Sequence, residues 1–165
     1  MQRISEITLV ELPIIQKLAF SIWPQTFREI LTQAQITYML DLFYSIPALE
    51  NQVSEKGHCF LVFYENEKPQ GFISYQLNAE GNKTKIHKLY VLQETQGKGI
   101  GKKLIQKVAH IAQENQNHAL FLNVNKYNLS AISFYEYMGF RKTKEEVIEI
   151  GEGYVMDDYV MEFQC

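Results

Sequence analysis

A run of alternating glycines between an apolar segment and an amphipathic one constrains the fold of this chain more than any other feature. The residues from Ile86 to Leu92 are apolar and β-branched, which predicts a buried strand. Gly97, Gly99 and Gly101 follow, and apolar residues then recur at helical spacing, at Leu104, Ile105, Val108 and Ile111. A glycine turn that opens a helix leaves the first backbone N–H groups unpaired at the positive end of the helix dipole. Because glycine lets a ligand approach the backbone closely, the pattern predicts an anion site suited to phosphate.

The spacing of these glycines excludes two common phosphate-binding loops. A P-loop requires G-x-x-x-x-G-K-[ST], but Gln96 stands five residues before Gly101, and Lys103 occupies the Ser/Thr position. A dinucleotide-binding loop requires G-x-G-x-x-G, but its third glycine would fall on Lys102 or Leu104. What the chain retains is the pattern Q-x-x-G-x-G, with one lysine inside it and two just after it.

The pattern Q-x-x-G-x-G over residues 96–101 resembles the acetyl-CoA pyrophosphate loop of the GNAT superfamily of N-acetyltransferases. A second stretch, from Asn128 to Phe140, is similar to that family's N-x-x-A-x-x-[FL]-Y-x-x-x-G-F signature and follows the loop at about the family's separation. The first half resembles the bacterial spermidine/spermine N-acetyltransferase subgroup more loosely, through residues 26–29, the helical insert up to Gly57 and the ending 158–163. For the loop alone, the alternative is an ordinary strand–turn–helix with a glycine-rich turn.

The resemblance implies the GNAT fold in one domain spanning residues 1–165. This is an α+β (α/β/α) fold, with a central mixed, mostly antiparallel sheet that is splayed at a bulged strand and flanked by helices. Hydrophobic periodicity along the rest of the chain predicts strands at 4–9, 60–64, 71–77, 119–124, 140–150 and 154–163. It predicts helices from Glu11 to Trp23-Pro24 and over 32–44, 47–55, 99–114 and 128–138.

The resemblance also assigns residues to acetyl-CoA. The backbone of Leu89, Tyr90 and Val91 would pair with the pantetheine arm and orient the thioester. The pyrophosphate would lie on the loop and the first helical turn, which comprise Gln96, Gly97, Lys98, Gly99, Ile100, Gly101 and Lys102. Asn128 would contact the cofactor near the pantetheine, and its alternative role is that of helix N-cap, which asparagine favours. The two roles are compatible.

Two side chains are catalytic candidates. The resemblance places Tyr135 beside the thioester sulfur, where its O–H would protonate the leaving thiolate. The alternative is a core tyrosine packed beside Phe134. Many family members carry a glutamate base at the position of Asn123, which cannot act as a base, and others carry one at the position of His87. Histidine has a suitable intrinsic pKa, but a base acting through water and a histidine without a role are the alternatives.

Composition narrows the function. The chain has 165 residues, of which 46% are hydrophobic and 21% charged, as in a globular protein. The net charge of −3 argues against a nucleic-acid partner. No apolar run approaches the roughly 20 residues that span a bilayer, and the first residues lack a signal-peptide pattern. Cys59 and Cys165 offer neither a metal cluster nor a disulfide framework. We therefore expect a cytoplasmic protein that binds neither nucleic acid nor membrane.

These features predict an acetyl-CoA-dependent N-acetyltransferase that acts on a primary amine, with a polyamine such as spermidine or spermine as the leading acceptor. Acidic residues of the closing hairpin would steer a polycation or would simply face solvent; they are Glu145, Glu146, Glu149, Glu152, Asp157 and Asp158. The alternatives are a peptide amine or an aminoglycoside as acceptor, and a non-catalytic acyl-CoA-binding protein. By analogy with the family, a homodimer through the C-terminal strand is a further expectation.

Overall fold

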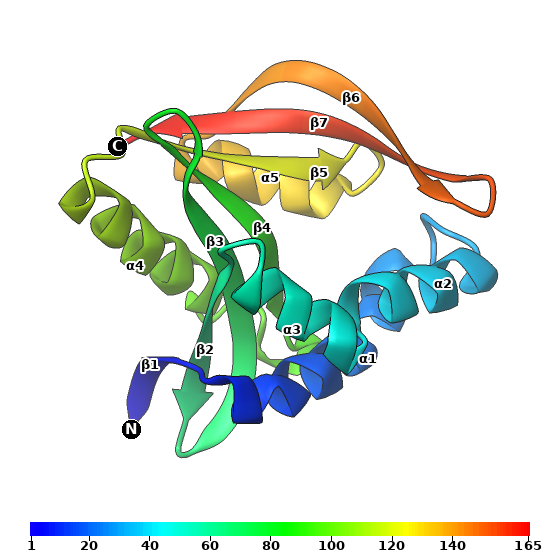
Figure 1. Cartoon of the computed structure of the whole chain (residues 1–165), viewed down its shortest axis with the longest axis horizontal. Helices are drawn as coiled ribbons and strands as arrows, with labels where there is room; N and C mark the ends of the chain where they lie inside the picture. Colours follow the sequence, from blue (N-terminus) through cyan, green and yellow to red (C-terminus); the bar gives the residue numbers. More distant parts are fainter. The chain divides into compact units, whose positions relative to one another are not determined.

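The computed structural model describes residues 1–165 and divides them into two compact units. Unit 1 comprises Met1–Gln76 and Lys88–Val108, and unit 2 comprises Leu77–His87 and Ala109–Cys165. Seven strands hydrogen-bond in the order β1-β2-β3-β4-β5-β7-β6, and five α-helices accompany them (Figure 1). The mixed sheet matches the expected fold class. The expectation of one domain over the whole chain stays a prediction. None of the helices combines the length and the hydropathy that a membrane-spanning helix requires.

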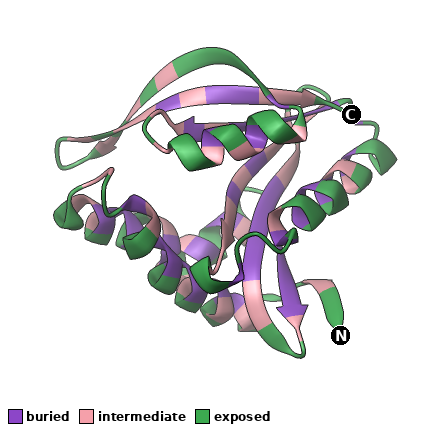
Figure 2. Ribbon diagram, turned by 180° about the vertical axis from the view of Figure 1, so that it is seen from behind, coloured by how far each residue is buried: buried purple, intermediate pink, exposed green.

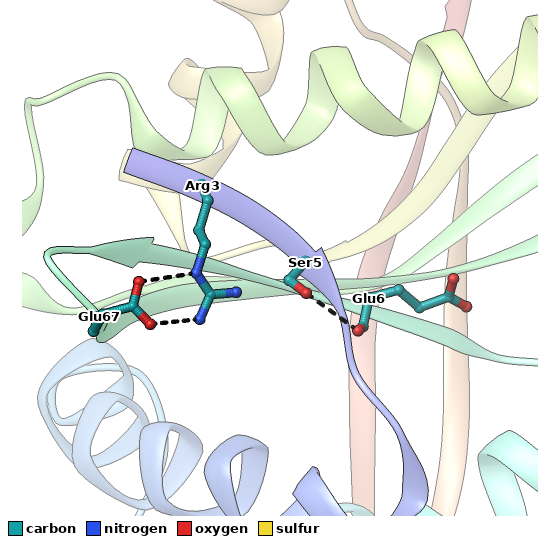
Figure 3. A network of polar contacts seen from close by, with 4 residues as sticks. All are labelled: Arg3, Ser5, Glu6 and Glu67. Atoms are coloured by element: carbon teal, nitrogen blue, oxygen red, sulfur yellow. Dashed lines mark hydrogen bonds and ion pairs between the residues drawn. The ribbon is translucent and has the colours of Figure 1, made fainter. Parts of the chain in front are cut away.

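In unit 1, three strands pair in antiparallel fashion. They are β1 (Gln2–Glu6), β2 (Cys59–Glu65) and the first part of β3 (Lys68–Glu80). Five consecutive residues of β2 are buried, which fits the unbroken apolar run Phe-Leu-Val-Phe-Tyr (Figure 2). The edge strand β1 is held by Arg3, whose guanidinium donates to both carboxylate oxygens of Glu67, at 3.2 and 2.9 Å (Figure 3). The predicted β2–β3 hairpin is confirmed.

Unit 1 also holds the N-terminal helices α1 (Leu12–Phe27), α2 (Gln33–Tyr44) and α3 (Ile46–Ser54). The second and third agree with the predicted helices, and Thr32 caps α2 by accepting the N–H of Gln35 at 3.1 Å. The prediction that the first helix ends at Trp23-Pro24 is wrong, because the helix runs on to Phe27 with Pro24 inside it. Phe27 packs on Trp23 one turn earlier, with 4.6 Å between the ring centroids, and both are buried. This burial offsets the hydrogen bond that Pro24 removes.

Unit 2 is built on the last three strands. Strand β5 (Ala119–Asn125) pairs parallel with the first residues of β4 (Lys83–Val91) and antiparallel with β7 (Tyr154–Gln164). Strand β6 (Arg141–Gly151) pairs with β7 to form the predicted closing hairpin, orange and red in Figure 1. Helix α5 (Leu129–Met138) precedes the hairpin and ends at Gly139, which adopts the left-handed conformation of a C-cap.

Unit 2 departs from prediction between the third and fourth strands. The predicted end of the third strand at residue 77 is wrong, because β3 continues through Glu80 and the turn follows it. The buried side chain of Asn117 accounts for this difference. Its Oδ1 accepts the backbone N–H of Asn78 at 3.1 Å and the hydroxyl of Thr84 at 2.7 Å, and its amide donates to Oδ1 of Asn78 at 2.9 Å. These bonds let Asn78 stay in the strand at a φ of 53°.

In unit 1, Gly71 of β3 lies against the end of β4. A Cβ on Gly71 would stand 2.9 Å from the carbonyl oxygen of Tyr90 and 3.2 Å from Cα of Val91. The first separation is shorter than real Cβ atoms show, and the second is tighter than most real Cβ contacts. The absent side chain therefore sets how closely β3 approaches the last residues of β4.

We predict that Gly71→Ala lowers the free energy of unfolding by about 1–3 kcal/mol, because the added methyl overpacks against backbone that has no room to move. Urea denaturation followed by circular dichroism measures the loss. Gln70→Ala, one residue earlier on the same strand, is the matched control and should cost less than about 0.5 kcal/mol. A Gly71→Ala protein as stable as wild type would contradict the steric assignment.

Candidate functional site

The glycine loop of unit 1 has the geometry of an anion site. Helix α4 (Ile100–Glu114) begins directly after Gly99, whose carbonyl accepts the N–H of Lys103 at 3.0 Å. The N–H groups of Ile100, Gly101 and Lys102 thus come before the first intrahelical bond. Gly97 and Gly99 have φ values of 85° and 78°, and a Cβ at either would meet nothing within 4 Å. The space over the loop is open, and the helix dipole favours negative charge there.

Short polar contacts tie the start of this loop to the end of β4. The N–H of Leu92 donates to the carbonyl of Gln70 at 2.9 Å, so the chain remains beside β3 as it leaves the strand. A short 3₁₀ turn follows, in which the hydroxyl of Thr95 donates to the carbonyl of Leu92 at 2.9 Å. The side-chain amide of Gln96 reaches back to the carbonyl of Val91 at 3.4 Å. The predicted loop residues are therefore joined into one continuous strand–loop–helix within unit 1.

The last residues of β4 pack on an aromatic cluster of unit 1. The ring of Tyr90 lies 5.6 Å from that of Trp23, 6.0 Å from Phe72 and 6.3 Å from Phe27, measured between centroids. Trp23 and Phe27 are 4% and 6% exposed, so this aromatic cluster belongs to the core.

Sequence reasoning missed the polar partner of this cluster. Lys88 of β4 is 9% exposed, and its ammonium donates to Oε1 of Gln52 at 2.8 Å. The same ammonium lies over the ring of Tyr44, at 5.5 Å, and over that of Phe60, at 5.6 Å. These rings and the Gln52 carbonyl replace part of the water that a buried ammonium loses. No sequence pattern predicts this arrangement, because a glutamine in a short helix is usually a surface residue.

In unit 2, Tyr135 is buried on α5. It is 8% exposed, and its ring lies 5.5 Å from the rings of Phe134 and Phe140. Burial raises the pKa of the Tyr135 hydroxyl above its ordinary value, so the side chain stays protonated and acts as a hydrogen-bond donor at neutral pH. Asn128 is the N-cap of the helix, since its Oδ1 accepts the N–H of Ala131 at 3.3 Å. Its predicted capping role is confirmed.

A cluster of polar side chains surrounds Asn123, the position that lacks a carboxylate. The Asn123 amide donates to Oε1 of Glu146 at 3.0 Å and to Oδ2 of Asp158 at 3.3 Å. Asp158 is 4% exposed, and burial raises the pKa of its carboxyl from 3.8 to about 6. His87 lies half-buried on β4 in the same unit. The structure thus supplies a buried carboxyl beside the asparagine that was expected to leave the site without one.

The acidic residues of the closing hairpin have diverse surroundings. Lys126 pairs with Glu145 and, at 3.0 Å, with Asp157, while Lys144 lies 3.6 Å from Glu146. Glu149 and Glu152 are exposed, as is Glu145. Only part of the hairpin's negative charge is therefore left to attract a cation. Asp158 could have been noticed from the sequence, because it shares the period-two face of Tyr154, Met156 and Val160.

Comparisons with known proteins agree with this picture. The model of the acetyltransferase (GNAT) family matches residues 19–140. A 5-NmdU N-acetyltransferase from Pseudomonas phage PaMx11 is 32% identical over 125 residues, which is 75% of this chain and 86% of that protein. Human N-acetyltransferase 8 is 29% identical over 57% of this chain, which spans only 43% of that longer protein.

Solved structures share the whole fold. The PaiA N-acetyltransferase from Thermoplasma acidophilum, in complex with coenzyme A, superposes with a TM-score of 0.83 at 24% identity over 100% of this chain and 99% of that one. The ribosomal-protein-S18-alanine N-acetyltransferase from Escherichia coli gives 0.74 at 17% identity, over 99% and 94% of the two chains. At these identities the likeness concerns the fold.

We predict that Asp158→Asn raises stability in a pH-dependent way. Because the pKa of Asp158 is higher in the folded chain than its ordinary value, its contribution to stability is fully present below about pH 4 and is lost as the pH rises through about 6. Asparagine does not titrate and can still accept from Asn123. The variant should therefore exceed wild type by about 1–3 kcal/mol near pH 7.5, and this difference should shrink toward pH 4.

Chemical denaturation across this pH range measures the difference. Glu149→Gln, an exposed change of the same charge on β6, should give no such trend. A stability difference for Asp158→Asn that does not vary with pH would contradict the burial argument.

Proposed function

Since this chain belongs to the acetyltransferase (GNAT) family, and is an acetyl-CoA-dependent N-acetyltransferase, we propose that it acetylates the primary amine of a small molecule by direct attack in a ternary complex. The strand–loop–helix of unit 1 carries the proposal. Its open, left-handed glycines and the unpaired N–H groups at the start of α4 suit a pyrophosphate. Acetyl-CoA supplies a thioester carbonyl that is open to an amine nucleophile.

The proposed binding residues form one continuous segment. The backbone of Leu89–Val91 would hydrogen-bond the pantetheine arm, and the main chain of residues 96–102 would hold the pyrophosphate. Lys98 and Lys102 are exposed and have no ion pair, so their charges are available to phosphate oxygens. Asn128 is proposed to contact the pantetheine through groups other than Oδ1, which caps α5.

Tyr135 is the proposed general acid. Its O–H would protonate the thiolate as the carbon–sulfur bond breaks, and the phenolate so formed would take the proton that the nitrogen loses on becoming an amide. Like any tyrosine at neutral pH, Tyr135 begins each cycle protonated, and burial raises the pKa of its hydroxyl further. His87 stays the proposed base from the resemblance, since half-burial leaves its imidazole partly accessible.

For the acceptor we keep a polyamine as the first candidate. Its support is the net negative charge of the closing hairpin, although Lys126 and Lys144 neutralise part of it. A second candidate is the kind of amine that the phage relative acts on, because this chain spans 86% of that protein at 32% identity. The two candidates differ in the molecule that carries the amine.

A thiol-release assay tests the function. Purified protein is incubated with acetyl-CoA and, separately, spermidine, spermine, a lysine-containing peptide, an aminoglycoside or a 5-NmdU nucleoside. We expect release with a small-molecule amine, with mass spectrometry showing one added acetyl group. Release with the peptide and with no small molecule would overturn the proposed acceptor class. Tight acetyl-CoA binding without release for any amine would make the protein a non-catalytic binder.

Tyr135→Phe is the matched variant in this assay, because it removes only the hydroxyl and keeps the ring between Phe134 and Phe140. Its turnover should fall roughly 100- to 10,000-fold. The Kd for acetyl-CoA should stay near the wild-type value. Unchanged turnover would rule out the general-acid role.

We predict that Gly99→Ala weakens acetyl-CoA binding. The left-handed conformation costs an alanine roughly 1–2 kcal/mol, so the free loop relaxes away from it, and binding must restore it. The Kd measured by isothermal titration calorimetry should rise roughly 5- to 30-fold. Gly57→Ala is a close control, since Gly57 also has open space around it and a φ of 74°, against 78° for Gly99. It should lower stability without changing the Kd, and an equal effect of both variants on the Kd would contradict the loop assignment.

A further inference from the structure

Asp158 is a buried carboxyl without a cation. It lies on β7 directly opposite Glu146 of β6 and Asn125 of β5. The lysines of the region pair elsewhere, Lys126 with Glu145 and Asp157, and Lys144 with Glu146. The one hydrogen-bond donor to Asp158 is the amide of Asn123, at 3.3 Å. A carboxylate in this position forfeits most of its hydration and gains little in return.

Glu146, the cross-strand neighbour on β6, adds to the free-energy cost of ionising Asp158. Two carboxylates directly opposite each other on one face of an antiparallel pair repel. Glu146 stays ionised despite this repulsion. Its carboxylate accepts a hydrogen bond from Asn123 and lies near Lys144, and both interactions lower the pKa of its carboxyl. The repulsion and the burial therefore disfavour the ionised form of Asp158. An asparagine or an apolar residue at this position would make the hairpin more stable at neutral pH. Packing therefore gives no reason for an acid at this position.

The groups that face Asp158 keep it titratable near neutrality. Burial, Glu146 and Asp157 raise its pKa, whereas the Asn123 amide and Lys85 of β4 lower it, and the balance is about 6. An acid with this pKa is mostly ionised at pH 7, yet it takes a proton far more readily than an ordinary aspartate. Groups tuned in this way are concentrated at sites of proton transfer.

We propose that Asp158, in place of the His87 that the resemblance suggests, is the proton acceptor of acetyl transfer, with Asn123 as the residue that positions it. This inference rests on the proposed function. The acceptor arrives as an ammonium ion, and one of its protons passes to a carboxylate oxygen of Asp158, directly or through one water molecule. The neutral nitrogen then bonds to the thioester carbon. As the carbon–sulfur bond breaks, Tyr135 protonates the leaving sulfur, and the phenolate so formed takes back the proton that the nitrogen loses on becoming the amide. Asp158 returns its proton to solvent, so each turnover yields one amide, one thiol and one proton.

The pH dependence of kcat/KM for wild type and Asp158→Asn tests the inference. Wild-type activity should fall below about pH 6, with the slope of a single proton. In Asp158→Asn this acidic limb should vanish, and kcat at pH 7 should drop roughly 100- to 10,000-fold. The Kd for acetyl-CoA and the melting temperature confirm that the variant is folded. Glu80→Gln, with the same charge change at an exposed position of β3 in the same unit, is the matched control and should retain the wild-type profile.

Two neighbouring variants give an independent readout. Glu146→Gln removes a charge that raises the pKa of Asp158, so the acidic limb should move to lower pH. Asn123→Leu removes the hydrogen bond that lowers this pKa, so the limb should move to higher pH. Opposite shifts identify Asp158 as the titrating group, whereas a merely structural role would leave the limb unmoved.

Three results would overturn the inference. The first is an Asp158→Asn enzyme with the wild-type limb and turnover. The second is loss of the limb in His87→Gln together with its retention in Asp158→Asn, which would make His87 the base. The third is an acidic limb that neither Glu146→Gln nor Asn123→Leu moves. A wild-type protein that releases no thiol with any amine would instead defeat the proposed function itself.

Discussion

The close approach of Gly71 to the backbone of Tyr90 and Val91 is the contact on which the proposed cofactor segment depends. With no side chain between them, β3 reaches the carbonyl of Tyr90, and the carbonyl of Gln70 can then accept the N–H of Leu92. That bond continues into the 3₁₀ turn and the glycine loop. The ring of Tyr90 also packs against the rings of Trp23 and Phe72. The strand end is thus held by backbone contacts and by aromatic packing, which is the rigidity that the proposed site for an extended thioester needs.

Much of the fold could be predicted because it follows from local rules. Glycine spacing and helical periodicity located the loop and α4, and the alternation of residues 154–163 located β7. The errors arose where distant residues decide the local structure. The rings of Trp23 and Phe27 carry α1 past Pro24 because they pack on Tyr90 of β4, and Asn117 keeps Asn78 in β3 from 39 positions away. No window of neighbouring residues contains that information.

The same distinction between local patterns and contacts with distant residues applies to the candidate site. The residues of the loop follow from a pattern, as does the capping role of Asn128, which a single hydrogen bond confirms. The surroundings of Asn123 could not be read in this way, because Glu146 and Asp158 reach it only through the pairing of β5, β7 and β6. Asn123 occupies a position where many family members carry a carboxylate, and its amide donates hydrogen bonds to two carboxylates, those of Glu146 and Asp158. A substitution at one position of a sheet is thus interpretable only with its cross-strand neighbours.

The aromatic cluster of unit 1 also provides an internal spectroscopic probe. Trp23 is the one tryptophan of the chain, and it is 4% exposed. Its indole lies 5.6 Å from the ring of Tyr90, a residue of the strand that is proposed to bind the pantetheine arm. Emission from a single indole in such a dry environment responds to small changes in its packing. Intrinsic fluorescence of the unlabelled protein therefore reports on the end of β4, so ligand-induced rearrangement there can be followed in real time without introducing a dye.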